Sequence, residues 1–431
     1  MADLLGLAAR YIDEGVYEGP GSVNRTNTEL SEVACGIALV EAFSHVVVLR
    51  TGEGLVLFDT SLEAFAAPIL ASLRRWSDAR VHTIAYTHGH VDHVGGSQAF
   101  VADARDRGYE PPRFVGHENV APRFARYERT NGWNVAINTR QFGRSGLLGG
   151  PDARFGPKTW VRPDTSFRER MRLSVGGHTL ELRHARGETD DHLWAWLPER
   201  KAIAVGDFVT WVFPNAGNPQ KVQRYPLEWA QALREMSALG AELLLPAHGL
   251  PIAGAARIAR VLDDIAGALE HVVNETLSRM NAGETLDAIV QGVRVPAHLL
   301  ERPYLRPVYD DPSFLVRMIW RRYAGWWDGD YDTLLPAPKA EQAREWIELA
   351  GGLAAVLARA EALSAQARHA LACHLAEAAL RAAPDDREVH RVRAAVYRAY
   401  SDTQSSSMGR NLLAHAALAS ERGRRDLAEA E

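Results

Sequence analysis

Three histidines and an aspartate lie within six residues, in the pattern His88-x-His90-x-Asp92-His93. In an extended chain alternate side chains point the same way, so His88 and His90 can face one metal ion as a pair. Asp92 and His93 come next, just before the chain turns through Gly95 and Gly96 into a helix. They could reach a second ion beside the first. Imidazole suits zinc and similar transition metals, and a carboxylate also accepts harder ions. A solvated loop would account for a lone histidine, but four metal-capable residues at this spacing indicate a metal site.

Three more candidate ligands each follow a later apolar run in the sequence. These are Glu188, Asp207 and His248. Because α/β scaffolds assemble their sites from several strand ends, we expect these residues to converge with the histidine motif. His184 and His192 flank Glu188 and could be substitute ligands, but we interpret them as residues that support the ligands or as polar residues at a strand end.

Apolar patterning predicts a layered α/β body in the first half of the chain. The runs 46–49 and 55–58 are joined by Thr-Gly-Glu-Gly, which is typical of a hairpin. Further strands are expected at 81–86, 180–182, 193–197, 202–205 and 243–245, and helices at 64–76, 95–107 and 227–239. Strands in hairpins with helices between them favour a mixed sheet covered by helical layers.

The second half of the chain changes character after residue 255. Strand signals nearly vanish there, and helices are expected at 256–279, 339–362, 368–382 and 387–400. A chain of 431 residues is too long for one ordinary core. The pattern therefore predicts an α/β domain followed by an all-α domain.

Composition excludes some classes of partner. The formal charge is −5 and no basic stripe is present, so we expect no nucleic-acid partner. No apolar run is long enough to span a bilayer, so we expect no membrane partner. The two cysteines, Cys35 and Cys373, cannot build a disulfide framework, and the N-terminus lacks the basic region of a signal peptide. We therefore expect a cytoplasmic protein.

The histidine motif, the Gly206-Asp207 pair and the segment Pro246-x-His248-Gly249 together resemble the metallo-β-lactamase fold superfamily. The resemblance covers about residues 30–255, the size of one domain. It implies an αββα sandwich with a two-metal site at one edge. Most members have histidine at the place of Glu188, and a glutamate there is similar to the alkylsulfatase branch.

The helical half carries a resemblance of its own. Tyr304-Leu305-Arg306-Pro307, the segment 323–329 and the segment 348–352 look like parts of the dimerisation domain that follows the metal domain in alkylsulfatases. That domain would cover about residues 256–400 and implies a homodimer formed through it. Residues 1–29 are then an N-terminal extension, and residues 401–431 a C-terminal helical tail.

The resemblance also assigns the ligands residue by residue. One ion would be held by the first two histidines of the motif and Glu188, the other by Asp92, His93 and His248, with Asp207 bridging them. The implied cofactors are two Zn²⁺ ions, with other divalent transition metals as alternatives. Paired cations lower the pKa of a bound water, so a metal-bound hydroxide is the expected nucleophile. Asp92 and Asp207 are the expected catalytic carboxylates.

Candidate substrate contacts follow from the same resemblance. Asn215 falls where alkylsulfatases carry an asparagine that helps to bind sulfate, although a Pro-Asn-Gly turn explains it equally well. Shortly after this asparagine, alkylsulfatases carry an arginine that binds the sulfate, and this arginine has no counterpart here. Lys221 or Arg224 is the expected substitute. Arg140 stands in the region of their tyrosines, where it could bind an anion but could not release a proton. Apart from the resemblance, Trp211 lies just past Asp207 in the sequence and is therefore the expected contact with an apolar part of the substrate.

The leading hypothesis is a binuclear metal-dependent hydrolase that cleaves a sulfate ester of an apolar alcohol. One alternative is a carboxylic ester, lactone, thioester or phosphoester as substrate of the same metal site. An iron-containing oxygen-reducing or dioxygenase member of the fold is another, since a glutamate ligand also suits iron. A non-catalytic helical interaction protein is the remaining alternative, but it predicts loss of a ligand, and every expected ligand position is filled.

Overall fold

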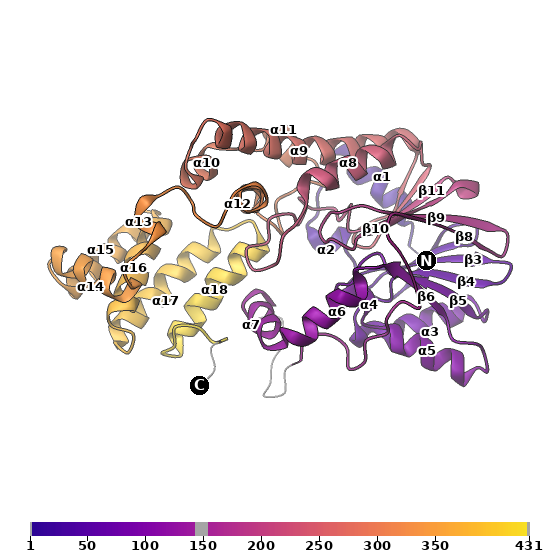
Figure 1. Ribbon diagram of the computed structural model, residues 1–431, viewed down its shortest axis with the longest axis horizontal. Helices are drawn as coiled ribbons and strands as arrows, with labels where there is room; N and C mark the ends of the chain where they lie inside the picture. Colours follow the sequence, from indigo (N-terminus) through magenta and orange to yellow (C-terminus); the bar gives the residue numbers. More distant parts are fainter. Residues whose placement is uncertain (1, 143–153, 429–431) are drawn as a thin grey trace.

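The computed structural model describes residues 2–142 and 154–428. Within this part of the chain, two β-sheets lie face to face at one end of the molecule, and helices form the other end (Figure 1). The first sheet has the strand order β1-β2-β3-β4-β5-β6-β7. Its strands are Leu30–Ala34, Ile37–Val40, Val46–Thr51, Gly54–Phe58, Val81–Ala85, Arg113–His117 and Thr165–Phe167.

The second sheet has the order β13-β12-β11-β10-β9-β8. Its strands, from β8 to β13, are Arg170–Val175, His178–His184, Leu193–Leu197, Ala202–Gly206, Leu243–Pro246 and Ile252–Ala253. Both sheets are mixed: β4, β5, β6 and β7 pair in parallel, as do β11 and β12, and the remaining pairs are antiparallel. The predicted hairpin is present as β3 and β4.

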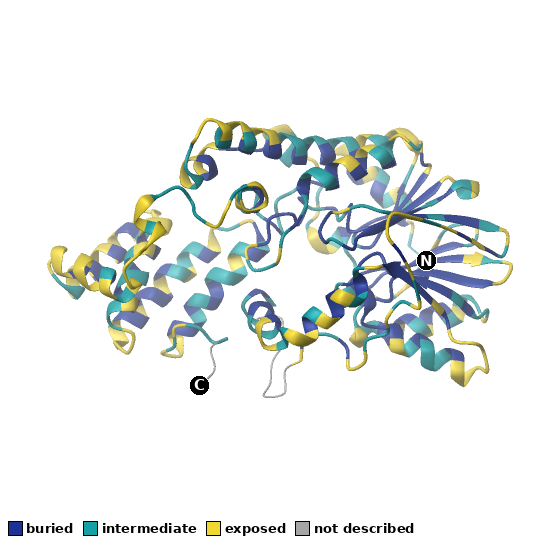
Figure 2. Ribbon diagram, viewed as in Figure 1, coloured by how far each residue is buried: buried dark blue, intermediate teal, exposed yellow. Residues whose placement is uncertain are grey.

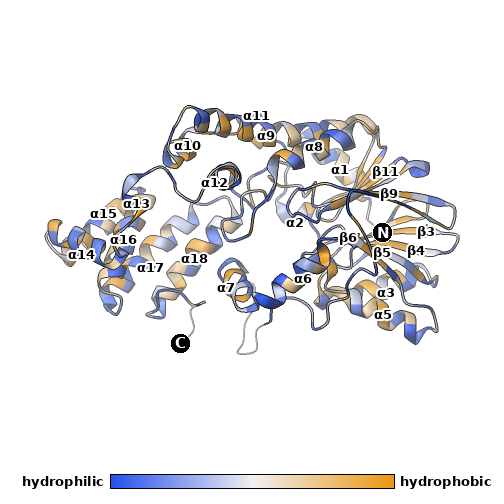
Figure 3. Cartoon of the chain, viewed as in Figure 1, coloured by the Kyte–Doolittle hydropathy of each residue, from blue (hydrophilic) through white to orange (hydrophobic). Residues whose placement is uncertain are grey.

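Alternation along the strands builds the core between the sheets. In β3, Val47 and Leu49 belong to the buried cluster shared with the second sheet, whereas Val46 and Val48 belong to a cluster on the outer face. Successive side chains of a strand point to opposite faces, so a continuous apolar run indicates a strand that is buried on both sides. Figure 2 shows the strands as largely buried, and Figure 3 shows that β3, β4 and β5 are rich in hydrophobic residues.

Helices cover the outer face of each sheet. The outer face of the first sheet packs against α3 (Ala66–Trp76), α5 (Ser97–Asp106) and α6 (Val120–Arg129). The second sheet is covered by α1 (Leu4–Glu14), α8 (Pro226–Ser237) and α9 (Ala255–Asn281) (Figure 1). The remaining elements near this body are α2 (Pro20–Val23), η1 (Glu63–Phe65), α4 (Val91–Val94), α7 (Asn131–Phe142) and η3 (Pro198–Arg200). This is the predicted αββα sandwich.

The helical half continues from α9. Its further helices are α10 (Leu286–Gly292), α11 (Ala297–Leu300), α12 (Pro312–Tyr323), α13 (Tyr331–Leu334), α14 (Lys339–Leu349), α15 (Leu353–Ala365), α16 (His369–Ala382), α17 (Arg387–Asp402) and α18 (Ser407–Glu421). Helices α15, α16 and α17 share a core of their own, while α18 packs against both α17 and α7. No helix in the described ranges is both long and apolar enough to cross a membrane.

One expectation about the helical half was wrong in detail. The long helix expected at 339–362 is two helices, because Gly351 and Gly352 adopt φ values of +88° and +102° between them. Such backbone angles suit glycine and end a helix. Helix α17 ends at Asp402, and α18, in the segment expected to be a helical tail, packs against it; the domain limits stay predictions.

Candidate metal centre

The predicted ligands meet at one edge of the sandwich. They come from the loop after β5, from α4, and from the turns that follow β9, β11 and β12. Among the described residues, three groups could hold an ion, with the ligand atoms of each group within 4.8 Å of one another. These groups are His88, His93 and Asp207; Asp92, His93 and His248; and His90, Glu188 and Asp207. All seven residues that the sequence singled out are therefore brought together.

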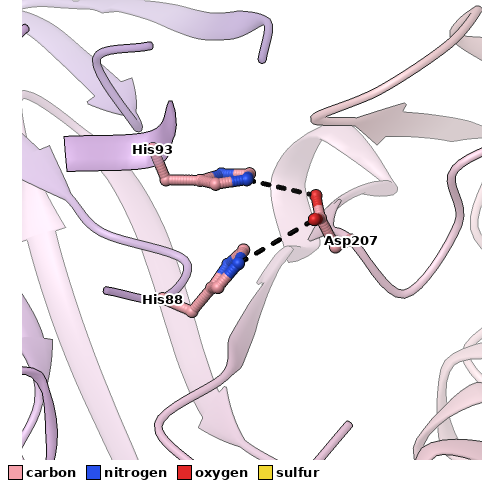
Figure 4. Close-up of side chains that lie close together, drawn as sticks. All are labelled: His88, His93 and Asp207. Atoms are coloured by element: carbon pink, nitrogen blue, oxygen red, sulfur yellow. Dashed lines mark ion pairs between the residues drawn. The ribbon is translucent and has the colours of Figure 1, made fainter. Parts of the chain in front are cut away.

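Asp207 lies between the two halves of this cluster. One carboxylate oxygen is 3.8 Å from Nε2 of His88, and the other is 3.4 Å from Nε2 of His93 (Figure 4). The second oxygen is also 3.5 Å from Nε2 of His248. On either side, His90 lies 3.7 Å from Glu188, and His248 lies 3.4 Å from Asp92. An aspartate in this position can reach both ligand sets, as a bridging residue must.

The chemistry of the cluster fits divalent transition-metal ions. His93 Nε2 and Asp207 Oδ1 are buried and have no hydrogen-bond partner among the described residues. Burial, together with neighbouring positive charge, holds the pKa of His88 and of His90 well below its usual value, so both rings stay neutral and can bind a metal. Burial alone would also lower the pKa of His93, but the carboxylates of Asp207 and Asp92 outweigh it and raise that pKa. The cluster thus carries excess negative charge that bound cations would neutralise.

Asp59 supports the metal centre and was not found from the sequence. Its carboxylate lies 2.7 Å from Nδ1 of His93 and accepts hydrogen bonds of 2.7 Å from both the backbone N and Oγ1 of Thr87. The residue directly follows β4 and has a φ of +65°, a backbone strain that is common at functional sites. A carboxylate on the second nitrogen of a ligand histidine fixes the ring and its tautomer. The available signal was an aspartate at the end of an apolar strand, the same signal that marked Asp207.

The turn after β11 requires glycine to place Asp207. Gly206 has a φ of +54°, and a Cβ there would lie 2.8 Å from both Nε2 of His192 and Cβ of Thr87. His192 Nε2 in turn accepts a 3.2 Å hydrogen bond from the backbone N of Asp207. Neither His192 nor His184 belongs to a ligand group among the described residues. His192 therefore has the supporting position that the sequence suggested.

Two residues that the sequence suggested as substrate contacts instead bind the carboxylate of Glu188. Asn215 donates from Nδ2 to Glu188 Oε1 at 2.7 Å, and the guanidinium of Arg224 forms an ion pair with the same carboxylate. All three side chains are buried. Burial raises the pKa of Glu188, and the charge of Arg224 opposes that rise. Arg224 Nε has no hydrogen-bond partner among the described residues, so this guanidinium still has a donor to offer.

The ligand cluster opens onto a cavity of about 1010 Å³ between the two halves of the chain. His90, Asp92, Glu188, Asp207 and His248 line one side. The helical half contributes Val308, Tyr309, Ser405, Ser407 and Arg410. The site is therefore not a property of the sandwich alone, because part of its wall comes from residues far along the chain.

Lys221 lies in this cavity, as the sequence suggested. Its Nζ donates a 3.2 Å hydrogen bond to Oδ1 of Asn138 on α7. Burial, together with the nearby charge of Arg224, lowers the pKa of Lys221 to about 7. No carboxylate lies within 4.0 Å of this lysine among the described residues, and its ammonium lies over the ring of Phe155, so it is a cation without an ion pair that loses its charge close to neutral pH.

The expected substrate contacts Arg140 and Trp211 do not line the cavity. Arg140 Nε donates a 2.8 Å hydrogen bond to Asp426, so its guanidinium links α7 to the C-terminal segment. Trp211 is fully buried and donates from Nε1 to the carbonyl of Leu250 at 2.8 Å. A Cβ on Gly249 would lie 2.3 Å from this indole, so Trp211 packs against the turn that carries His248. Both predictions are corrected: these residues support the structure around the site.

The cavity wall opposite the metal centre holds residues that the sequence did not reveal. Asn138 and Gln141 lie one turn apart on α7, and both are buried. Gln141 Nε2 donates a 2.9 Å hydrogen bond to the hydroxyl of Tyr309. No strand end or motif marks these positions, and Tyr309 comes close to Gln141 only through tertiary packing.

Two family models match separate parts of the chain. A model described as metallo-beta-lactamase superfamily matches residues 39–248, and one described as alkyl sulfatase dimerisation matches residues 285–423. The chain is a metallo-β-lactamase-fold protein with an alkylsulfatase-type dimerisation domain. The resemblance seen in the sequence and the fold inferred from it are confirmed. Members of this fold bind divalent metal ions, and the ligand cluster of this alkylsulfatase-like chain agrees with that property.

Comparison with known proteins places the chain near alkylsulfatases. It is 28% identical over 365 residues to a linear primary-alkylsulfatase of Pseudomonas sp., covering 81% of this chain and 69% of the relative. It is 27% identical to an (R)-specific secondary-alkylsulfatase of Pseudomonas sp., covering 73% of this chain and 50% of that protein. An alkyl/aryl-sulfatase of Saccharomyces cerevisiae is 25% identical, with coverages of 74% and 52%. The chain thus spans about half the length of the last two.

A solved structure shares the fold over both halves. The stereoselective inverting sec-alkylsulfatase from Pseudomonas sp. superposes with a TM-score of 0.80 at 22% identity. The match covers 92% of the alkylsulfatase-like chain and 66% of the solved chain. The way in which the helical half closes over the sandwich is therefore a shared feature of this architecture.

Proposed function

We propose that this chain is a metal-dependent hydrolase of sulfate monoesters of apolar alcohols. The proposal rests on the charges of the residues that line the cavity. Among the described residues, its cationic lining consists of Arg123, Arg126, Arg154, Lys158, Lys221, Arg224 and Arg410. Apart from the proposed metal ligands, the only carboxylate in that lining is Glu63. Arg123 and Arg224 are paired with carboxylates, but among the described residues the other five cations have no carboxylate partner within 4.0 Å, so the cavity keeps positive charge that suits an anionic ester although the chain has a formal charge of −5.

The same observation separates the alternatives. A lactone or a carboxylic ester is neutral at the reacting group and gains little from several cations around it. Apolar side chains such as Phe43, Ile137, Phe155 and Val222 share the lining and suit an alkyl or aryl part of the substrate. The matched relatives are named for alkyl and aryl sulfate esters. A phosphoester remains the second candidate, because it is also anionic.

The proposed cofactor is a pair of Zn²⁺ ions. His88, His90 and Glu188 would hold one ion, and Asp92, His93 and His248 the other, with Asp207 between them. When bound, such ions lower the pKa of a coordinated water and neutralise charge on the ester. Asp59 orients the ring of His93, and Asn215 together with Arg224 fixes the carboxylate of Glu188.

The remaining polar groups of the cavity would bind the sulfate. Lys221 supplies a positive charge that no carboxylate within 4.0 Å neutralises in the described structure, and Arg224 has a free Nε–H. The segment that corresponds to the alkylsulfatase arginine reads Pro219-Gln220-Lys221, and the first arginine beyond it is Arg224. Hydrogen bonds to charged groups contribute about 1.5–3 kcal/mol each, so these two cations would provide much of the affinity for the anion.

A matched substrate panel tests this proposal. Purified, zinc-loaded protein is offered decyl sulfate, decyl acetate, decyl methyl phosphate and a decanoyl lactone, and the free alcohol or acid is quantified. We expect decyl sulfate to give the highest kcat/KM, and Lys221→Met to raise KM for it without affecting decyl acetate. Faster hydrolysis of a neutral ester would overturn the proposal. Elemental analysis should find about two zinc ions per chain.

We also propose that the helical half forms a homodimer. Between the end of α12 and α14 the chain exposes Tyr323, Trp326, Tyr331, Leu335, Trp346 and Leu349, with Trp326 at 78% and Leu335 at 91% exposure (Figure 2). A contiguous stretch with so many exposed large apolar residues is typical of an interaction surface. It lies within the segment that matches the dimerisation model. Sedimentation analysis of Trp326→Glu with Leu335→Glu should show a monomer, whereas Leu371→Glu, at an exposed position of α16, should leave the dimer intact.

A further inference from the structure

Four cations that line the cavity are not needed by the proposed sulfate site. These are Arg126, Arg154, Lys158 and Arg410. In the described part of the chain, none of them has a carboxylate within 4.0 Å of its charged group. A sulfate monoester carries a single negative charge at neutral pH, and Lys221 and Arg224 are already proposed to bind it. The cavity therefore holds more positive charge than a singly charged substrate requires.

Arg126 offers the clearest unused donors among these cations. It lies on α6 and is half-buried, and its guanidinium makes no hydrogen bond with any other described residue. Its Cζ lies 5.3 Å from the ring centre of Tyr127. Arg123, one turn earlier on the same helix, instead pairs with Asp190 and Asp191. Because a guanidinium has five N–H donors, Arg126 is able to bind an anionic group that enters the cavity.

An aromatic pair separates Arg126 from Lys221. Lys221 Nζ lies 5.7 Å from the ring centre of Phe155, and the rings of Phe155 and Tyr127 meet edge to face with their centres 5.0 Å apart. Arg126 lies against the ring of Tyr127. Both rings are buried and line the cavity. The cation proposed to meet the sulfate and the unused guanidinium are therefore held apart, with apolar surface between them.

The segment around Phe155 carries two further cations. Arg154 and Lys158 flank this ring in the sequence, and both are exposed residues of the cavity lining. The backbone N of Phe155 donates a 3.0 Å hydrogen bond to Oδ1 of Asn131, which ties the segment to the start of α7. Glu63, the carboxylate of this lining, accepts a 3.3 Å hydrogen bond from the backbone N of Lys158 and not from its ammonium. Because these two cations are exposed, they lie on the solvent side of the cavity.

A purely apolar tail would fit this arrangement poorly. If it lay along Phe155 and Tyr127, it would take water from the guanidinium of Arg126 without offering an acceptor, which costs free energy. A chain that ends in an anionic group would supply that acceptor. We infer that the substrate has two anionic groups, a sulfate ester that meets Lys221 and a second anion that binds Arg126, joined by an apolar chain. This inference rests on the proposed sulfate-ester activity and defines its substrate more closely.

Matched esters of increasing length test the inference. Zinc-loaded wild-type protein is assayed at physiological ionic strength with linear alkyl sulfates from butyl to dodecyl that end either in a methyl group or in a carboxylate. At one chain length we expect kcat/KM for the carboxylate-terminated ester to exceed that for the methyl-terminated ester about tenfold, the contribution of one charged hydrogen bond. Shorter and longer chains should show less preference, because the distance between the two cations is fixed. Bis-sulfates of the same lengths show whether the second position prefers a carboxylate or a sulfate.

Variants of α6 separate contact with the second anion from the general charge of the protein. Arg126→Met should remove most of the preference at the best chain length, and Arg126→Lys should retain part of it, because a lysine keeps the charge but not the fork of the guanidinium. Arg129→Met is the control and should keep the full preference. Arg129 is an exposed residue of the same helix outside the cavity lining, and its loss changes the net charge equally. Thermal unfolding of both methionine variants detects any loss of the fold, and in that case Arg126→Lys decides.

Three outcomes would overturn the inference. These are equal kcat/KM values for the two series at every length, a preference that does not depend on length, and an equal effect of Arg126→Met and Arg129→Met. The last two would show long-range attraction rather than a second binding position. Failure of the proposed function looks different, because wild-type protein would then hydrolyse none of the sulfate esters. Calorimetry with non-hydrolysable alkyl sulfonates, with and without a terminal carboxylate, would still measure whether a second anion is bound.

Discussion

The metal centre and the opposite wall of the same cavity are built in different ways. Every proposed ligand lies in a short segment that directly follows a buried strand, so the sheets fix its position. The opposite wall consists of α7, the segment around Tyr309 and the first turn of α18, which meet only when the helical half packs onto the sandwich. Asn411 of α18, for example, donates a 2.8 Å hydrogen bond to the carbonyl of Gln141 on α7.

This difference separates the two tasks of the site. The ligand side presents buried imidazoles and carboxylates whose arrangement serves metal binding. The opposite wall presents amides, a tyrosine and a lysine, which recognise the substrate. Changes on the ligand side should therefore remove activity on every substrate, and changes on the wall should affect substrates unequally.

The largest effect is expected from Asp207→Asn. This change keeps the shape of the side chain but removes the charge that faces His88 on one side and His93 and His248 on the other. Activity should fall at least about a thousandfold, because a metal ion contributes several kcal/mol of transition-state stabilisation. Metal content, measured by elemental analysis, should fall with it. Asp13→Asn, which alters only the exposed ion pairs with Arg257 and Arg260, is the control, and full activity of Asp207→Asn with two bound ions would contradict the site.

A smaller loss is expected from Asp59→Asn. The side chain that lies 2.7 Å from Nδ1 of His93 would lose its negative charge, but all the proposed metal ligands would remain. Removing such a supporting carboxylate typically costs about 10–100-fold in metal affinity or activity. Zinc affinity by competition with a chelator, measured beside kcat, checks this. If zinc affinity and kcat were both unchanged, Asp59 would have only a structural role.

The two sides also differ in how far the sequence reveals them. His88, His90, Glu188, Asp207 and His248 could be found because a polar residue after an apolar run marks a strand end, and strand ends meet at one edge of a sheet. Asp59 obeys the same rule, because it directly follows β4, but it precedes the histidine motif in the sequence, whereas the three further ligands follow it. The αββα sandwich followed from the same apolar patterning.

The opposite wall could not be found in this way. Whether Gln141 or its neighbour Arg140 faces the cavity depends on the rotation of α7, and that rotation is set by contacts with α18 and Asp426, almost 300 residues away in the chain. Trp211 adjoins the Asp207 turn in sequence, but a φ of +57° turns it away into the core beneath Gly249. Tyr309 carries no local signal. Tertiary packing, which leaves no periodicity in the sequence, decides these positions.

A pH-dependent effect is expected at Lys221. Because its pKa is lowered to about 7, it is charged below that pH and largely neutral above it. Binding of an anionic ester by the free enzyme should therefore weaken as the pH rises through 7, which lowers kcat/KM on the alkaline side. Lys221→Arg keeps its charge, so that decline should move to higher pH. Lys221→Met at pH 6 should raise KM about 10–100-fold, the loss of one charged hydrogen bond. Identical pH profiles for wild type and Lys221→Arg would exclude this role.

The smallest effect is expected from Arg140→Gln. This change tests whether Arg140 belongs to the cavity wall opposite the metal centre. The side chains of Arg140 and Asp426 are 24% and 21% exposed, and a pair of this kind contributes about 0–1 kcal/mol to stability. The melting temperature should fall slightly, and KM for decyl sulfate should not change, because the guanidinium does not line the cavity. Asp426→Asn should lower the melting temperature similarly, and the double variant should cost no more than either single one. A rise in KM in Arg140→Gln but not in Asp426→Asn would instead place this arginine on the substrate, and the boundary of the wall would then have to include the outer face of α7.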